Sequence, residues 1–251
     1  MGSIAHIKLR SHSGFGLVEL LVSVAIGLLI LLAVFSVFLS TTKTDKTQDA
    51  LARVQENANY VAEAISGATR RAAYRSDPQQ ALAYCDDPSI GFPAATIGTF
   101  SFLGCEFIRG TNSSFAIRYR GAKDGLTRDC IGALVAADAM TTEVWDMSGT
   151  NLRCSVNGGA ANTMVENVGN IRYVYGVDTD SMDLARGVDA YSNAADVANW
   201  RKVSALRVEV LLQSPGEVNT ERQSYSFNGS TITPTDLRLR KTYQTTFRIR
   251  N

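Results

Sequence analysis

The sequence predicts an α+β fold, in which one long N-terminal helix packs on an antiparallel β-sheet. Three patterns carry this prediction. Residues 20–39 contain no charged side chain, and residues 51–72 place apolar side chains three and four positions apart, as on one face of a helix. The C-terminal half then alternates apolar and polar residues, as strands do. A helix followed by strands indicates segregated layers rather than repeated βαβ units.

The first element is an apolar helix that begins near residue 15. Residues 20–39 are 20 uncharged positions, enough for a helix to cross the hydrocarbon core of a bilayer. Lys8 and Arg10 precede this run, and Glu19 stands at its head. The run is too long for a cleaved secretory signal, and no small-x-small cleavage site follows it. Because a plain anchor gains nothing from a carboxylate at its edge, Glu19 indicates a further role.

This N-terminal pattern resembles the class III signal of type IV pilins and pseudopilins. A basic leader ends in Gly14, Phe15 follows, Glu19 is the fifth residue after the glycine, and a long apolar run comes next. The resemblance implies that prepilin peptidase cuts between Gly14 and Phe15 and N-methylates Phe15. It also implies that Glu19 and the apolar helix serve assembly with other minor and major pilins. No proline interrupts the apolar helix, although many major pilins have one there.

A second helical pattern continues from the first. Its apolar positions follow spacings of three and four residues and are Leu51, Val54, Ala58, Val61, Ile65, Ala68 and Ala72. We therefore expect one helix from about Phe15 to Arg75, ended by Ser76-Asp77-Pro78, because the residue before a proline is pushed out of the helical region. A coiled coil is the alternative. The small alanines and the short length of the seam favour packing on a sheet.

The remaining residues, 76–251, number 176, which is ample for one domain with its own core. Strands are expected at 115–119, at 144–147 paired with 152–156 as a hairpin, and at 171–175, 206–212 and 237–249. The first of these should bury one face only. Lys241 interrupts the apolar face of the last strand and indicates a bulge or a sheet edge. Residues 79–110 and 178–199 are expected to be loops.

Short stretches of the C-terminal portion resemble the PilW branch of minor pilins. They are the run from Tyr175 to Thr179, Trp200 leading into residues 203–212, the closing residues 248–251, and Arg70 to Tyr74 at the helix end. This resemblance implies a minor pilin of the assembly-initiating or tip complex that supports pilus biogenesis, twitching motility and adhesion, with DNA uptake and a tip adhesin as further associations. The alternatives are a J-type pseudopilin of type II secretion and a membrane-anchored adhesin or enzyme.

Four cysteines, Cys85, Cys105, Cys130 and Cys154, all follow the apolar helix, and none forms a C-x-x-C pair. Zinc ribbons and thioredoxin-like redox motifs are therefore not indicated. An even number of cysteines beyond a membrane segment predicts two disulfides, since that compartment oxidises thiols. Three pairings are open. The nearest-neighbour pairing joins Cys85 to Cys105 and Cys130 to Cys154, and four buried free thiols are the alternative.

Charge and histidine content argue against several functions. The chain has 25 Lys and Arg against 24 Asp and Glu, and removal of the leader leaves 23 against 24. A nearly neutral protein is not expected to bind nucleic acid through bulk charge. Both histidines, His6 and His12, lie in the leader. The processed chain would have no histidine for acid–base catalysis or zinc binding, so we expect no enzyme activity, metal or cofactor.

Three other motifs have plainer readings. Asp178, Asp180 and Asp183 are acidic enough for a loose calcium loop, but the EF-hand template fails at its fifth, sixth and twelfth positions, and a solvated loop is favoured. Residues 40–43 match S-x-x-K without its partner motifs, which indicates chance. A basic stripe on the last strand is read as a solvated sheet face rather than a DNA or partner surface, and consists of Arg238, Arg240, Arg248 and Arg250.

The sequence thus divides into a leader (1–14), a transmembrane and assembly helix (15–40), an amphipathic helix (41–75) and a β-rich globular domain (76–251). We expect a single-pass inner-membrane protein whose C-terminal domain lies in the periplasm before the protein enters a pilus fibre or its tip.

Overall fold

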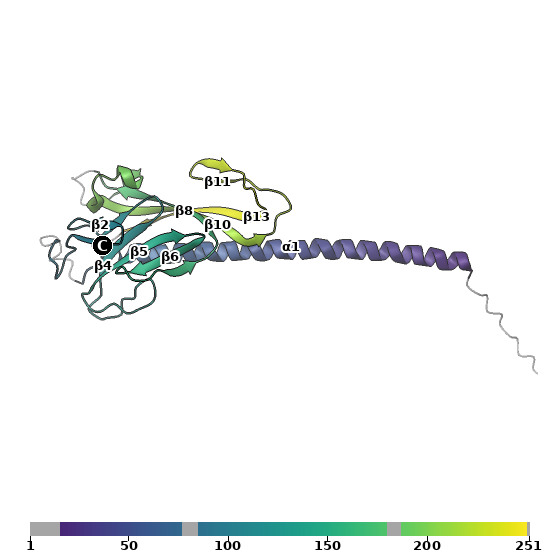
Figure 1. Cartoon of the computed structure of the whole chain (residues 1–251), viewed down its shortest axis with the longest axis horizontal. Coiled ribbons are helices and arrows are strands. Elements are labelled where there is room, and N and C mark those ends of the chain that lie inside the picture. Colours follow the sequence, from purple (N-terminus) through teal and green to yellow (C-terminus); the bar gives the residue numbers. More distant parts are fainter. Residues whose placement is uncertain (1–15, 77–84, 180–186, 250–251) are drawn as a thin grey trace, which may run out of the picture. The chain divides into compact units, whose positions relative to one another are not determined.

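The computed structural model describes residues 16–76, 85–179 and 187–249. Gly14 and Phe15 therefore lie outside the described residues, as do Asp180, Asp183 and Arg250. The chain divides into two compact units, Met1–Thr47 and Gln48–Asn251. Helix α1, Leu17–Arg71, is a single helix of 55 residues with residues in both units (Figure 1).

The first unit consists, where described, of the N-terminal part of α1. Its apolar side chains are exposed along the whole of residues 17–39, from Leu17 at 76% to Leu39 at 47%. Within the described residues α1 is the helix long and apolar enough to cross a membrane, with a mean hydropathy of 2.9 in its best window. The uncharged run therefore forms the helix that the sequence predicts.

The second unit begins with the amphipathic part of α1, and the predicted seam is buried there. Its buried apolar positions are Ala50, Val54, Ala58, Val61, Ile65, Ala68 and Ala72. Leu51, the first residue of the expected seam, is only partly buried. Ala50 takes its place because it lies four residues before Val54, on the same side of the helix.

The helix ends at Arg71, four residues before the expected end at Arg75. Ala73 adopts a left-handed conformation with φ of 64°, which stops the helix. The chain then pairs with strand β4 (Phe115–Arg120): the Ala73 N–H donates to the Arg118 carbonyl at 3.0 Å, and the Arg120 N–H donates to the Tyr74 carbonyl at 2.9 Å. Pairing with a strand, rather than Pro78, therefore terminates the helix.

A four-stranded antiparallel sheet has the order β13-β10-β8-β9. The strands are β8 (Val168–Val177), β9 (Ala190–Ser192), β10 (Val203–Glu217) and β13 (Arg238–Arg248). The three strands expected here are thus present. Lys241 lies on an edge strand opposite Leu212, and the irregular register falls instead between Gln213 and Glu217 of β10.

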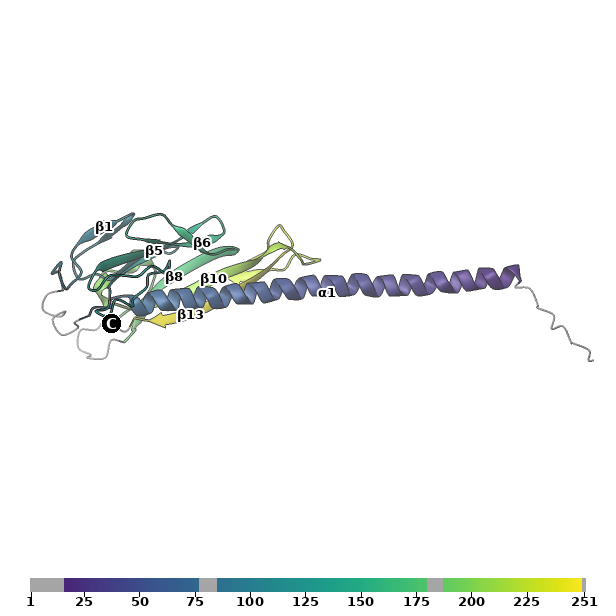
Figure 2. The ribbon, with the colours of Figure 1, turned by 90° about the horizontal axis from the view of Figure 1, so that it is seen from below.

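A second, five-stranded antiparallel sheet has the order β3-β4-β5-β6-β7, so the expected single sheet is in fact two larger sheets. Beside β4 its strands are β3 (Ile108–Gly110), β5 (Met140–Ser148), β6 (Asn151–Val156) and β7 (Asn162–Val165). The predicted hairpin is β5–β6, closed where Ser148 pairs with Asn151. In both views the sheets lie alongside the last turns of α1 (Figures 1 and 2).

Several segments expected to be loops contain short elements. These are β1 (Ala95–Ile97) with β2 (Phe100–Phe102), strand β3, strand β9 and the 3₁₀ turn η1 (Ala194–Asp196). A second 3₁₀ turn, η2 (Trp200–Lys202), follows them. A further hairpin, β11 (Tyr225–Phe227) with β12 (Ser230–Ile232), was not predicted. Its turn is Asn228-Gly229, both at positive φ, and this dipeptide is a strong hairpin signal.

Strand β4 is buried on both faces, whereas one exposed face was expected. Arg118 and Arg120 are 1% and 4% exposed. Arg118 donates to the carbonyls of Pro93 and Glu106, and Arg120 donates to those of Pro88 and Gly91. The segment before β4 therefore folds over its outer face, and it does so because two guanidinium groups satisfy its carbonyl oxygens.

Candidate assembly site on helix α1

Glu19 lies in the first turn of α1, at the start of the exposed apolar segment. Its backbone N–H donates to the Gly16 carbonyl at 3.0 Å, so the helix is already formed at this residue. A carboxylate in the first turn is favoured by the helix dipole. The Glu19 side chain is exposed, with apolar neighbours on either side in Val18 and Leu20.

Six hydroxyl side chains on this part of α1 form hydrogen bonds within the helix. Ser23, Ser36, Thr41, Thr42, Thr44 and Thr47 each donate to a carbonyl three or four residues earlier. These bonds remove the cost of placing a hydroxyl in apolar surroundings. Thr42 belongs to the S-x-x-K match, and its hydroxyl donates to the Phe38 carbonyl at 2.8 Å.

Two disulfides join the four cysteines in the nearest-neighbour pairing. Cys85 is bonded to Cys105 and Cys130 to Cys154, with Cα–Cα distances of 5.0 and 6.4 Å. Asp86 lies beside the first pair and Glu143 beside the second, in groupings that resemble metal sites. Since all four sulfur atoms are consumed in disulfides, neither group has thiolates to offer a metal.

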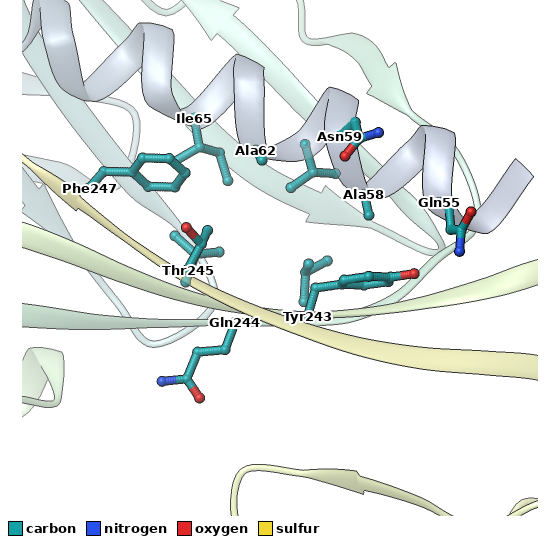
Figure 3. Close-up of a pocket in the computed structure, with 12 residues that line it drawn as sticks. Gln55, Ala58, Asn59, Ala62, Ile65, Tyr243, Gln244, Thr245 and Phe247 are labelled. Carbon is teal, nitrogen blue, oxygen red and sulfur yellow. The ribbon is translucent and has the colours of Figure 1, made fainter. Parts of the chain in front are cut away.

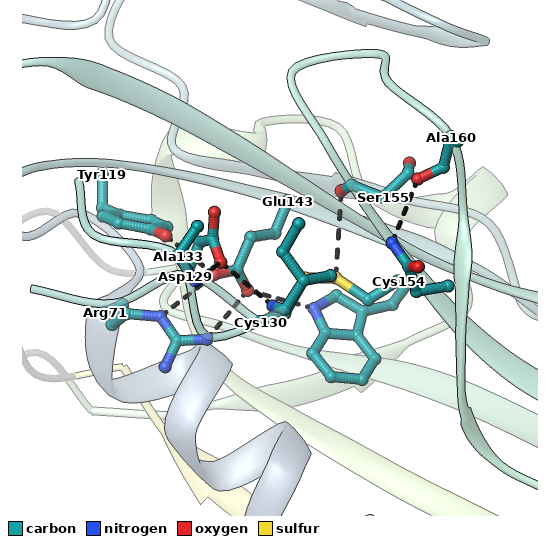
Figure 4. Close-up of a disulfide and its surroundings, with 12 residues drawn as sticks. Arg71, Tyr119, Asp129, Cys130, Ala133, Glu143, Cys154, Ser155 and Ala160 are labelled. Carbon is teal, nitrogen blue, oxygen red and sulfur yellow. Dashed lines mark hydrogen bonds and ion pairs between the residues drawn. A yellow bond between two sulfur atoms is a disulfide. The ribbon is translucent and has the colours of Figure 1, made fainter.

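A buried carboxylate connects the end of α1 to the five-stranded sheet (Figure 4). Glu143 on β5 is 0% exposed and accepts two hydrogen bonds from the Arg71 guanidinium, at 3.1 and 2.9 Å. It also accepts from the Tyr119 hydroxyl at 2.8 Å and the Trp145 indole at 3.3 Å. Burial, and then the charge of Glu143, raise the pKa of Tyr119 well above its usual range. We call these four residues the Glu143 cluster.

The Glu143 cluster was not identified from the sequence, although a signal for it exists. In an alternating strand, Glu143 falls on the same face as Thr141 and Trp145, which is the buried face. An acid on a buried face requires a cationic partner. Arg71 at the end of the helix was the available candidate.

Two family models match parts of this chain. A family model described as Type IV Pilus-assembly protein W matches residues 135–251, and a model of the prokaryotic N-terminal methylation motif matches residues 9–35. Together these two matches support a PilW-like type IV minor pilin. No curated protein matches it. Among solved structures it is similar to a type IV-like pilin, TTHA1219 from Thermus thermophilus, at 15% identity and a TM-score of 0.34, over 56% of this chain and 81% of that one.

The methylation motif implies that prepilin peptidase processes this minor pilin and that it assembles with other pilins. The apolar part of α1 fits anchoring in a membrane and association with a pilus. Within the described residues, the apolar side chains of residues 17–39 are exposed, and Glu19 lies at the start of this surface.

Of the acidic cluster and the basic stripe of the minor pilin, the structure describes Asp178, Arg238, Arg240 and Arg248. Asp178 has one buried carboxylate oxygen without a hydrogen-bond partner among the described residues. On the stripe, Arg240 binds Asp236 through two hydrogen bonds, at 2.5 and 2.8 Å. Hydrogen bonding from Arg240 lowers the pKa of Asp236 to about 2. Arg238 donates to the Ser214 carbonyl at 3.4 Å, so two of the arginines are already engaged.

Proposed function

We propose that this minor pilin acts in the assembly-initiating or tip complex of a type IV pilus. The observation that carries the proposal is the match of its C-terminal half to a family described as pilus-assembly proteins, on a chain that also has the methylation motif. The proposed organisation is a leader (1–14), an assembly helix (15–40), an amphipathic helix (41–75) and a globular domain (76–251).

Processing is proposed to occur between Gly14 and Phe15, with N-methylation of Phe15. Intact mass of the protein purified from membranes tests this step directly. We expect a chain that begins at methylated Phe15, and a chain that still begins at Met1 in a host with active peptidase would contradict it. Gly14→Ala should be cut better than Gly14→Val, because a β-branched side chain is bulkier at the cut site.

Glu19 is proposed to pair with the newly exposed N-terminal amine of a neighbouring pilin. In an apolar environment each charge has few alternative partners, so such a pair is strengthened. A pair of this kind would set the axial position at which one subunit meets the next. The exposure of Glu19 at the start of an uncharged helix supports this role.

The globular domain is proposed to lie in the periplasm before assembly. Its two disulfides support this orientation, since they require an oxidising compartment. We further propose that the protein has no catalytic role, because its only histidines, His6 and His12, lie in the leader. Adhesion, twitching motility and DNA uptake would then depend on it through the pilus.

Deletion of the gene, with complementation by the full chain, tests the proposed function. We expect the deletion to lower the number of surface pili and to abolish twitching, with type II secretion unchanged. The alternative, a J-type pseudopilin, is favoured by the shared long helix and sheet. It predicts the reverse result, with normal pili and failed secretion.

A further inference from the structure

The amphipathic part of α1 has an uncharged groove along one flank, between the helix and edge strand β13 (Figure 3). Its volume is about 310 Å³. The residues that line it are Gln55, Ala58, Asn59, Val61, Ala62, Ile65, Val208, Val210, Tyr243, Gln244, Thr245 and Phe247. We call this the β13 groove. All of these residues belong to the second compact unit.

The groove exists because β13 extends sideways past the helix. Val208 and Val210 on neighbouring β10 are 1% and 4% exposed, since α1 covers them. Their register partners on β13, Thr245 and Tyr243, are only partly buried. Figure 3 shows Phe247 beside Ile65 and Tyr243 below Ala58, so the strand and helix run side by side along the groove.

The outer edge of β13 is left open over most of its length. β13 is the last strand of its sheet, and the hairpin β11–β12 approaches it at Thr242, whose hydroxyl donates to the Ser226 carbonyl. In the part of the chain that the structure describes, no strand pairs with this edge beyond that point. The groove is therefore accessible from the side.

The other flank of α1 carries charged side chains, unlike the flank that forms the β13 groove. Two cavities there, of about 350 and 440 Å³, share Tyr60 and Met164 and are lined by charged side chains. These include Arg53, Glu56, Glu63, Arg70, Arg71, Asp129 and Glu166. By contrast, no acidic or basic residue lines the β13 groove. Its occupant must therefore be uncharged along the buried side, because an unpaired charge there would lose its hydration.

We propose that the β13 groove binds an uncharged face of the N-terminal helix of a neighbouring pilin. This inference rests on the proposed function. Ala62, which is only partly buried, is small enough to let a second helix approach closely, and the helical wall from Gln55 to Ile65 is about 15 Å long. In a neighbouring copy the apolar segment of α1 has no charged residue over residues 20–39, which matches the uncharged lining of the groove.

The first experiment fills the groove. Ala62→Trp is introduced into the full-length chain, with Ala52→Trp as a matched control, because Ala52 is exposed on the same helix and lines none of these cavities. Disulfide formation and protease resistance check that each variant is folded. We expect Ala62→Trp to lower recovery of the protein in sheared pili about tenfold, with little change for Ala52→Trp. Equal recovery of both variants would overturn the proposal.

The second experiment identifies the occupant. A photo-crosslinking phenylalanine analogue is placed at Asn59, which lines the groove, or at Glu56, which lines the charged flank. Mass spectrometry of the adduct from pilus-producing cells should find, at Asn59 only, a peptide from the N-terminal helix of a pilin. A peptide from a strand, a non-pilin protein or no adduct at Asn59 would overturn the proposal. If pili also form normally without this gene, the proposed function itself fails.

Discussion

The two parts of α1 differ in what covers them. In residues 17–39 the apolar side chains are exposed, and Leu29 and Leu31 are 67% and 65% exposed. In residues 50–72 the apolar side chains of the seam are buried, and Val54 and Ile65 are 0% exposed. One part of the helix therefore completes the core of its own chain. The other presents apolar surface that only lipid or another chain can cover.

Because of this difference, the role of α1 in folding can be tested separately from its role in assembly. Substitutions on the buried seam should lower the free energy of unfolding, whereas substitutions in residues 17–39 should leave the globular domain unchanged and affect membrane insertion or assembly. The predictions below test this division, using a fragment of residues 41–251 for stability. We expect that fragment to be soluble, folded and monomeric.

Val61→Asp should have the largest effect on stability. Val61 is 2% exposed in the helix–sheet core, and an aspartate there buries a charge without a partner. We expect the free energy of unfolding to fall by about 3–5 kcal/mol, measured by urea denaturation. Ala52→Asp, on the exposed face of the same helix, is the control and should change it by less than about 0.5 kcal/mol. A small effect for Val61→Asp would mean that the amphipathic part does not complete the core.

Loss of the Cys130–Cys154 disulfide should be the next largest effect. The two cysteines are 24 residues apart, and chain entropy alone predicts a loss of about 3 kcal/mol for Cys130→Ser with Cys154→Ala. Removal of Cys85–Cys105, with a separation of 20, should cost a similar amount. Non-reducing peptide mapping checks both bridges first. Four free thiols in periplasmic protein would contradict the pairing.

Glu143→Gln should destabilise the end of α1 more moderately. The amide has one oxygen for the donors of Arg71, Tyr119 and Trp145, and its NH₂ group faces a further donor. We expect Glu143→Gln to lower the free energy of unfolding by about 2 kcal/mol. Tyr119→Phe removes a single donor and should lower it by about 1 kcal/mol. Hydrogen exchange should show faster opening of the last turn of α1. Equal stability of Glu143→Gln and the wild type would contradict a role for the Glu143 cluster in holding that turn.

Asp236→Asn should have the smallest effect, which is a change in how the stability of the domain depends on acid pH. Hydrogen bonding from Arg240 lowers the pKa of this carboxyl to about 2, below its ordinary value of 3.8. Its stabilising contribution is therefore complete above about pH 4 and is lost as the pH falls towards 2. Because the Asp236 side chain is 32% exposed, we expect its ion pair with Arg240 to contribute less than about 1 kcal/mol to the free energy of unfolding. Asp236→Asn should reduce the difference in the free energy of unfolding between pH 5 and pH 2.5, measured by urea denaturation, and an unchanged difference would contradict this role of Asp236.

The sequence predicted those features that depend on local periodicity. The exposed apolar helix, the buried seam and the strands β8, β10 and β13 all follow from side-chain spacing, and the turn of β5–β6 follows from its residue types. The pairing of the cysteines needed the fold, because three pairings were open until the strands were placed. The same holds for the helix end, since Ala73 pairs with β4 and that contact is distant in sequence.

Long-range polar contacts account for most of what was missed. Arg118 and Arg120 were expected on an exposed face, because alternation alone cannot show that residues 85–107 fold back over them. The Glu143 cluster unites residues from the helix and two strands, and no local pattern joins Arg71 to Glu143. The β13 groove likewise depends on how far β13 extends past the helix. Its residues are individually ordinary, and their shared lack of charge appears only in the fold.

Incorporation of the Glu19→Ala variant tests the division between folding and assembly most directly. In a strain that carries only this variant, intact mass should show normal cutting at Gly14, and the globular domain should have wild-type disulfides and stability. Co-purification with other pilins and the number of surface pili should both fall well below those of the wild type. Wild-type levels of both would contradict the account, because Glu19 would then be a tolerated residue at the membrane surface with no part in assembly.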